Sequence, residues 1–175
     1  FGYSSWTEWP APYRDCERET LDAYATALKN STFPSLADAP FSRHSTHYRL
    51  LAHINEVAEA GLMLADFAYS HWPDEWTKKL DRQELLQILL LHDLDKYLLL
   101  SDESLEMSIA HGTLSAMILN DLGFDSRVIE AVASHSPSAS LHLDDPASMI
   151  LHYCDLFSCD HIYMLVSRTP HYCMK

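Results

Sequence analysis

Residues 82–100 read RQELLQILLLHDLDKYLLL, and this stretch decides how the rest of the chain is interpreted. Apolar residues fill most of it, and its main interruption is the polar group His92, Asp93, Asp95 and Lys96. A helix that is apolar on nearly all sides is normally surrounded by other elements. We therefore expect residues 82–100 to form a central helix, with His92 and Asp93 near its end.

The segments on both sides of this stretch also show helical patterns. Within 50–68, apolar side chains recur every three or four positions, as on the buried face of a helix. Further helices are expected at 17–30, 101–123, 125–135 and 144–166. Strand signals are almost absent, so the sequence predicts an all-α fold of about six helices. We expect one compact unit, with an aromatic arm and helix at 1–42 and a helical metal-binding domain at 43–175.

The composition is that of a globular protein with a strongly acidic surface. The chain has 175 residues, of which 47% are apolar, and its formal net charge is −13. This charge repels nucleic-acid backbones and anionic membranes, and no apolar run is long enough to span a bilayer. We therefore expect no nucleic acid polymer and no membrane as partner. Bound cations could still attract a small anionic substrate locally.

The cysteines and the N-terminal arm bear on location and assembly. Cys16, Cys154, Cys159 and Cys173 form no CxxC pair, and we interpret them as reduced, mostly buried thiols of a cytoplasmic protein. Residues 1–16 form an irregular aromatic arm that could pack across a homodimer interface, and the oligomeric state is left open.

Six residues with metal-binding side chains are spread over five expected elements: His53, His92, Asp93, His111, His135 and Asp155. Imidazole and carboxylate groups bind first-row transition metals, and helical bundles build metal sites from side chains on several helices. His47 competes with His53, because it lies on the same helical stripe. The remaining histidines are expected to be structural or surface residues: His44, His71, His142, His152, His161 and His171.

The order H…HD…H…H…D on a helical chain of this size resembles the HD-domain superfamily of metal-dependent phosphohydrolases. The local contexts are similar as well. LLLHDLDKY (89–97) resembles the signature helix, and ILHYCD (150–155) resembles the last helix with its terminal aspartate. HGTLSAMIL (111–119) and VIEAVASH (128–135) resemble the segment found in relatives with an expanded, dinuclear site. The resemblance covers roughly residues 45–165.

The resemblance implies two divalent or transition metal ions and a role for each residue. One ion would be held by His53, His92, Asp93 and Asp155, and a second by His111, His135 and the bridging Asp93. Iron is favoured and manganese comes next, because the ligands are mixed nitrogen and oxygen donors at high coordination. Asp93 and Lys96 would be the catalytic residues. A water or hydroxide between the metals would be the nucleophile, and Lys96 would contact an anionic oxygen.

Two positions depart from the pattern of the relatives. Many relatives with an expanded site carry a second histidine where this chain has Ser136, which leaves two metals but makes a third unexpected. Asp95 stands where relatives usually have a small residue, and it adds a carboxylate near the site.

The leading interpretation is a metal-dependent phosphohydrolase that acts on a small phosphorylated substrate, with a nucleotide as the first expectation. The alternative is a mixed-valence di-iron oxygenase, because the same ligand pattern resembles myo-inositol oxygenase and the HD-type oxygenases that cleave phosphonates. A third interpretation is a binding or signalling domain whose site no longer turns over substrate. The ligand set alone does not separate hydrolysis from oxygenation.

Overall fold

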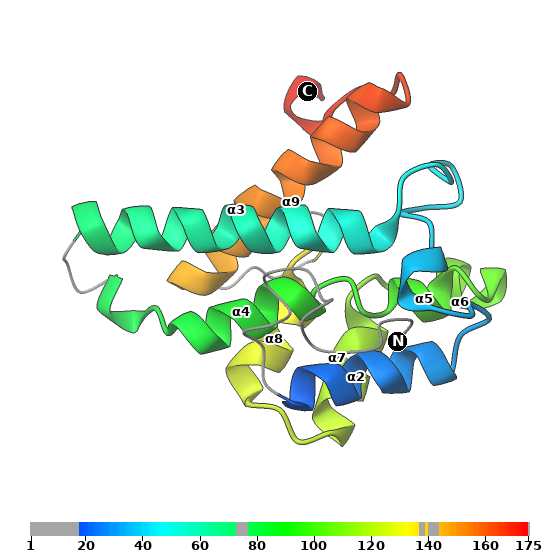
Figure 1. Ribbon diagram of the computed structural model, residues 1–175, viewed down its shortest axis with the longest axis horizontal. Coiled ribbons are helices and arrows are strands. Elements are labelled where there is room, and N and C mark those ends of the chain that lie inside the picture. Colours follow the sequence, from blue (N-terminus) through cyan, green and yellow to red (C-terminus); the bar gives the residue numbers. More distant parts are fainter. Residues whose placement is uncertain (1–17, 73–76, 137–138, 140–143, 175) are drawn as a thin grey trace.

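The computed structural model describes residues 18–72, 77–136, 139 and 144–174, and their fold is all-α, as predicted (Figure 1). The helices are α2 (Arg18–Lys29), α3 (Leu50–His71), α4 (Arg82–Leu91), α5 (Lys96–Leu99), α6 (Glu103–Ser108), α7 (Thr113–Asp121), α8 (Ser126–Ser134) and α9 (Pro146–Leu165). Short 3-10 turns form at η2 (Leu36–Asp38), η3 (Thr77–Lys79) and η4 (His171–Cys173). No strand forms within the described ranges, where Pro40 and Arg49 make an isolated bridge. The aromatic arm at 1–16 lies outside the described residues.

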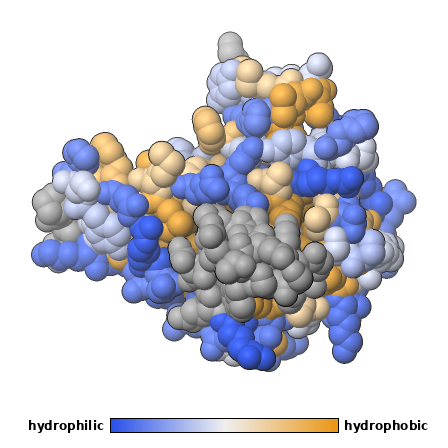
Figure 2. Space-filling view, viewed as in Figure 1, coloured by the Kyte–Doolittle hydropathy of each residue, from blue (hydrophilic) through white to orange (hydrophobic). Residues whose placement is uncertain are grey.

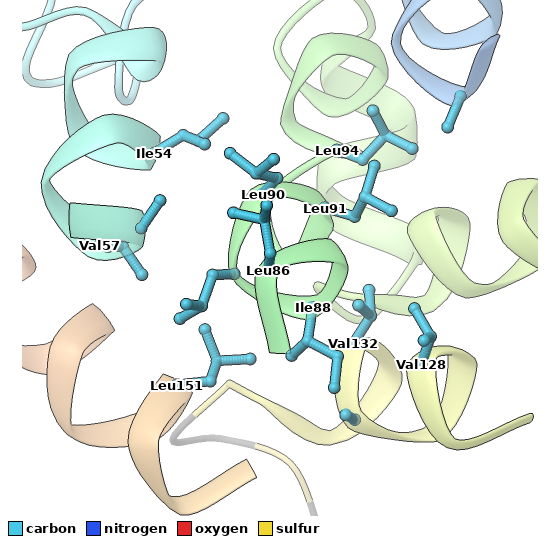
Figure 3. Packing of buried hydrophobic residues seen from close by; sticks show 14 of the residues in the cluster. Ile54, Val57, Leu86, Ile88, Leu90, Leu91, Leu94, Val128, Val132 and Leu151 are labelled. Atoms are coloured by element: carbon cyan, nitrogen blue, oxygen red, sulfur yellow. The ribbon is translucent and has the colours of Figure 1, made fainter. Parts of the chain in front are cut away.

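Helix α4 lies at the centre of the molecule, in contact with α2, α3, α8 and α9. Figure 3 shows its side chains directed toward these neighbours, with Ile54 and Val57 facing it from α3 and Leu151 from α9. The leucines and isoleucine of α4 are all buried: Leu85, Leu86, Ile88, Leu89, Leu90 and Leu91. Burial of one such side chain contributes roughly 1.5–3 kcal/mol. The apolar run that predicted a central helix therefore supplies the middle of the core.

Gly61 allows α3 and α4 to pack closely. A Cβ atom at this position would lie 2.5 Å from Leu89 Cδ1, and Leu89 is fully buried. The missing side chain lets the two helices approach. This contact holds α3, which carries His53, against the helix that ends at His92.

Aspartate side chains cap the N-termini of α8 and α9. Asp125 accepts a hydrogen bond from the Arg127 N–H at 2.8 Å, and Asp145 accepts from the Ala147 and Ser148 N–H groups at 3.0 and 3.1 Å. Such side chains satisfy backbone donors that have no partner within the helix. The helices predicted at 125–135 and 144–166 are confirmed with these starts.

The single helices expected at 82–100 and 101–123 are each broken, which corrects the prediction. Helix α4 ends at Leu91, and the bonds Leu94 N–H to Leu91 O (3.2 Å) and Lys96 N–H to Asp93 O (3.1 Å) make tight turns before α5. Helix α6 ends at Ser108, and Gly112 adopts a φ of 89° before α7. A tight turn changes the angle between successive side chains, so His92 and Asp93 can both face one centre.

The surface seen in Figure 2 is mostly polar, with hydrophobic residues on the end of α9 that projects at the top of Figure 1. Met164, Leu165 and Tyr172 are exposed in that region. Within the described ranges, no helix combines the length and the apolar character that crossing a membrane requires.

Candidate metal centre

The fold brings all six predicted metal-binding side chains to one place. They come from α3, the end of α4 and its following turn, the loop before α7, the C-terminal end of α8 and the middle of α9: His53, His92, Asp93, His111, His135 and Asp155. Two overlapping groups contain them, and Asp93 belongs to both. The Cys159 thiol lies near His53 and Asp155 and is a further possible ligand. His47, the competitor of His53, is exposed at the surface instead.

The first group surrounds His53. Its Nε2 atom lies 3.2 Å from His92 Nε2, 3.2 Å from Asp93 Oδ2 and 3.3 Å from Asp155 Oδ1. His92 Nε2 lies 3.6 Å from Asp93 Oδ2 and 3.8 Å from Asp155 Oδ1. Ligand atoms about 2.1 Å from a shared ion are themselves about 3.0–3.4 Å apart. The spacing around His53 is therefore close to that of ligands of one ion.

The second group uses the other oxygen of Asp93. Asp93 Oδ1 lies 2.8 Å from His111 Nε2 and 3.7 Å from His135 Nε2, and these two nitrogens are 3.1 Å apart. Asp93 Oδ2 faces the first group and Oδ1 faces the second, which is the arrangement of a carboxylate that bridges two ions.

In His53, His92 and His135, the Nδ1 atom contacts a group outside the metal centre. His92 and His135 donate from Nδ1 to the backbone oxygens of Leu89 (2.8 Å) and Val132 (2.7 Å). His53 Nδ1 lies 2.9 Å from Ser158 Oγ, whose proton is already donated to Glu56, so the serine oxygen accepts. These partners place the proton on Nδ1 and leave Nε2 free to bind a metal.

His111 has a charged partner instead. Its Nδ1 atom lies 3.0 Å from Asp95 Oδ1, in an ion-pair contact. An unprotonated Nδ1 would set its lone pair against the carboxylate, so the proton belongs on Nδ1 here too.

A test of fit comes from Asp93, which is 1% exposed. Among the described residues, neither of its oxygens accepts a well-oriented hydrogen bond, although imidazole nitrogens and Lys96 surround it. A buried carboxylate without such partners is costly, and cations on both of its oxygens would remove that cost. The donor set of imidazole nitrogens and carboxylate oxygens fits divalent first-row metals.

Burial and neighbouring carboxylates shift the pKa values of these histidines in different directions. Burial lowers the pKa of His92 to about 4, so the ring is neutral and its Nε2 can bind a metal at pH 7. Burial also opposes a charge on His111, but the Asp95 and Asp93 carboxylates raise the pKa of His111 to about 10. An ion that binds His111 must therefore displace a proton from it.

The two carboxylates remain ionised. Burial disfavours their charge, but the positive charge of Lys96 holds the pKa of Asp93 well below its usual value. The neighbouring His53 imidazole likewise lowers the pKa of Asp155 against the effect of burial. Both groups therefore offer negatively charged oxygens at neutral pH.

A comparison with protein families identifies this arrangement. The profile described as the HD domain matches residues 50–159, which cover more than half of the chain and include all six side chains. The chain belongs to the HD-domain family. The predicted resemblance is thereby confirmed, and the family is in general one of metal-dependent phosphohydrolases. Neither the curated proteins nor the solved structures gave a significant match.

Lys96 lies between the candidate metal ligand Asp93 and the cavities beside the centre. Its ammonium nitrogen lies 2.6 Å from Asp93 Oδ2 and 4.1 Å from the centre of the Phe41 ring. Burial opposes the charge, but Asp93 raises the pKa of Lys96, so the lysine remains a cation. The contact of Lys96 with an anion of the substrate stays a prediction.

Two adjoining cavities open beside the centre. One, of about 250 Å³, is bordered by Lys96, His111 and Asp155 and, from the C-terminal segment, by Tyr163 and His171. The other, of about 160 Å³, is bordered by Lys96 and His111 and by the apolar side chains of Leu99, Leu100 and Ile109. Phe41 and Ser42 line both.

Several of these cavity residues were not predicted from the sequence. His171 was expected to be structural or on the surface, but its Nδ1 atom lies 2.9 Å from Asp160 Oδ1, its ring stacks on Tyr163, and it borders the larger cavity. Cys159 was expected in the core, but it borders the same cavity and donates to Asp155 Oδ1 at 3.3 Å. Both residues contact partners on α9, and no sequence motif marks them.

Among the described residues, the other cysteines and histidines give no further metal group. Cys154 is buried and Cys173 is exposed, and both are free thiols. His44, His71 and His161 are exposed, and His152 is partly buried. His142 and Cys16 lie outside the described residues.

Proposed function

We propose that this HD domain is a metal-dependent phosphohydrolase that acts on small phosphorylated molecules, with nucleotides as the first class to screen. The observation that carries the proposal is the position of Asp93, whose two oxygens face two separate groups of imidazole nitrogens. Two ions bound there would polarise a phosphate and activate a water molecule. Iron or manganese fits the mixed nitrogen and oxygen donors better than zinc does.

The chain's own residues would divide the remaining work. Asp93 and Asp155 supply negative charge, and the outward Nδ1 contacts hold the imidazole rings in place. Lys96 borders both cavities and would donate a hydrogen bond to an anionic oxygen of the substrate. The Phe41 ring lies against the lysine and limits where its ammonium group can move.

The size of the cavities supports a small substrate. Volumes of about 250 and 160 Å³ are modest beside the roughly 300–1,000 Å³ of typical ligand pockets. Lys96 and His111 border both cavities. The larger one has further polar and ionisable side chains, whereas the smaller one is bordered by leucine and isoleucine side chains and by Glu106. A phosphate with a compact organic group matches this division.

Phosphate release and oxygen consumption, measured side by side, test the proposal. The protein is purified without chelator, its metal content is determined by elemental analysis, and nucleoside monophosphates and sugar phosphates are offered under anaerobic conditions with iron or manganese. Phosphate release that depends on metal, and that Asp93→Ala abolishes while the exposed Asp121→Asn does not, would support the hydrolase. Oxygen consumption with a phosphonate or polyol, without anaerobic phosphate release, would favour the oxygenase. Two bound metals with neither activity would leave a binding domain.

The assembly and location of the protein stay predictions. A possible homodimer rests on the aromatic arm, a cytoplasmic location rests on the cysteines, and the absence of nucleic acid or membrane partners rests on the charge. Light scattering of the full chain and of a chain without residues 1–16 would test the first of these.

A further inference from the structure

We propose that Asp95 is a positioning residue that builds the second half of the metal centre by fixing the place and the tautomer of His111. The inference rests on the proposed dinuclear centre. It concerns a buried carboxylate that is not one of the six proposed ligands.

Asp95 is buried, and its carboxylate and its N–H contact the segment from His111 to Ser115. Its Oδ1 atom lies 3.0 Å from His111 Nδ1, in an ion-pair contact that is not a well-oriented hydrogen bond, and its Oδ2 atom accepts the Gly112 N–H at 2.5 Å. Its own N–H donates to Ser115 Oγ at 2.8 Å. A fully buried carboxylate needs such partners, because its charge is otherwise costly in the interior. Asp95 therefore ties the turn after α4 to the loop before α7.

Gly112 extends this connection to α8. Its φ of 89° lies in the left-handed region, and a Cβ atom there would meet Val132 O at 2.8 Å and Ala133 O at 3.1 Å. The loop is thus pressed against the end of the helix that carries His135, and the same Val132 oxygen accepts from His135 Nδ1. The two histidines of the second group are consequently held by one continuous set of contacts.

The contrast with the other histidines explains why a carboxylate is needed. His92 and His135 each donate to a backbone oxygen three residues earlier, so their own helices fix their tautomers. His111 lies in the loop after α6, and at 26% exposed its side chain is the most open of the four metal-facing imidazoles. For His111, the acceptor near Nδ1 is the Asp95 carboxylate from another segment, whereas for His92 and His135 it is a backbone oxygen of the same helix.

Asp95→Asn is the decisive substitution. The amide has one accepting and one donating end, whereas His111 Nδ1 and the Gly112 N–H both need an acceptor. If the amide oxygen keeps Gly112, its NH₂ group faces Nδ1 and drives the proton to Nε2, where it blocks a metal. If the amide is flipped, the NH₂ group faces the Gly112 N–H. Either orientation weakens the second half of the centre while nearly preserving the volume of the side chain.

The first measurement is metal content and affinity. Asp95→Asn should lower the affinity for the second ion by about 10- to 100-fold and leave the first ion bound. Asp121→Asn, an exposed change of the same chemistry, should bind like the wild type, and equal metal content in all three proteins would overturn the proposal.

The second measurement needs neither metal nor turnover. Above the pKa of His111, where its ring is neutral, imidazole ¹⁵N NMR spectra of the metal-free proteins should show the proton on Nδ1 in the wild type and on Nε2 in Asp95→Asn, with His135 unchanged. A His111 signal that is identical in both proteins would overturn the proposal. If the wild type holds no second ion, the dinuclear function fails, and the spectra still decide whether Asp95 sets the tautomer.

Discussion

Lys96 Nζ lies 2.6 Å from Asp93 Oδ2, on the oxygen that also faces His53 and His92. One positive charge thus sits on the carboxylate that is proposed to bridge two metal ions. The lysine lowers the pKa of Asp93 against the effect of burial, and it also borders both cavities. Its charge therefore acts on the metal side and on the substrate side of the same site.

Replacement of Lys96 should affect these two sides in opposite directions. In Lys96→Met, metal affinity should stay equal or rise, because a competing cation leaves Asp93. Affinity for inorganic phosphate should fall by roughly 10- to 100-fold, the value of one charged hydrogen bond. Elemental analysis and calorimetric titration measure the two effects. Lys96→Arg, which keeps the charge, should restore part of the phosphate affinity, and a loss of metal from Lys96→Met would contradict this assignment.

Asp93 and His135 should differ in how many metal ions they control. Asp93→Ala should remove both ions, because its two oxygens face the two groups. His135→Ala should mainly weaken the second ion, because its Nε2 atom lies near Asp93 Oδ1 and His111. Elemental analysis after dialysis gives the ions per chain. Full metal content in Asp93→Ala would show that the bridging assignment is wrong.

The metal-free protein should lose stability as the pH rises from about 6.5 to about 10. Burial opposes the charge of His111, but Asp95 and Asp93 raise its pKa from 6.5 to about 10. Between these values the native state binds a proton that the unfolded chain releases, so the contribution is complete below pH 6.5 and is lost toward pH 10. Urea midpoints measured with chelator at several pH values test this. His111→Ala should flatten the profile, and an equal slope in both proteins would assign the effect to other groups.

His171 should contribute to substrate binding and little to turnover. Its ring is held by Asp160 and Tyr163 and borders the larger cavity. Loss of one hydrogen bond costs about 0.5–1.5 kcal/mol, so His171→Ala should raise KM by roughly 2- to 10-fold with kcat nearly unchanged. Steady-state kinetics with any substrate found in the screen separate the two parameters. The exposed His44→Ala serves as control, and an unchanged KM in His171→Ala would remove this residue from the binding site.

The parts of the fold that local sequence determines were predicted well. Asp125 and Asp145 mark the starts of α8 and α9 through side-chain caps, and the apolar spacing in 50–68 marks α3. The breaks at 92–95 and 109–112 were missed. An apolar run looks the same in an α-helix and in a tight turn, and the local sign of the second break was the glycine at position 112, which adopts a φ of 89°.

The candidate site was likewise predicted only in part. The six ligand candidates were found because their spacing and contexts resemble a family, and the structure brings all six together. Asp95 was noticed only as a departure, because its partners His111 and Gly112 lie on another segment. His171 was set aside, because its approach to the cavity depends on how the chain returns after α9. Contacts between distant segments are what a single sequence shows least.

The position of the six side chains on five separate segments has a consequence for the whole chain. In the proposed metal-loaded state, the ions would act as cross-links that join α3, α4, α8 and α9 at one point, and they would shorten the loops that unfolding must open. The free energy of metal binding would then stabilise the packing of all four helices. Chelation would loosen the packing of these helices as well as empty a site, and metal supply would determine how long the folded chain survives.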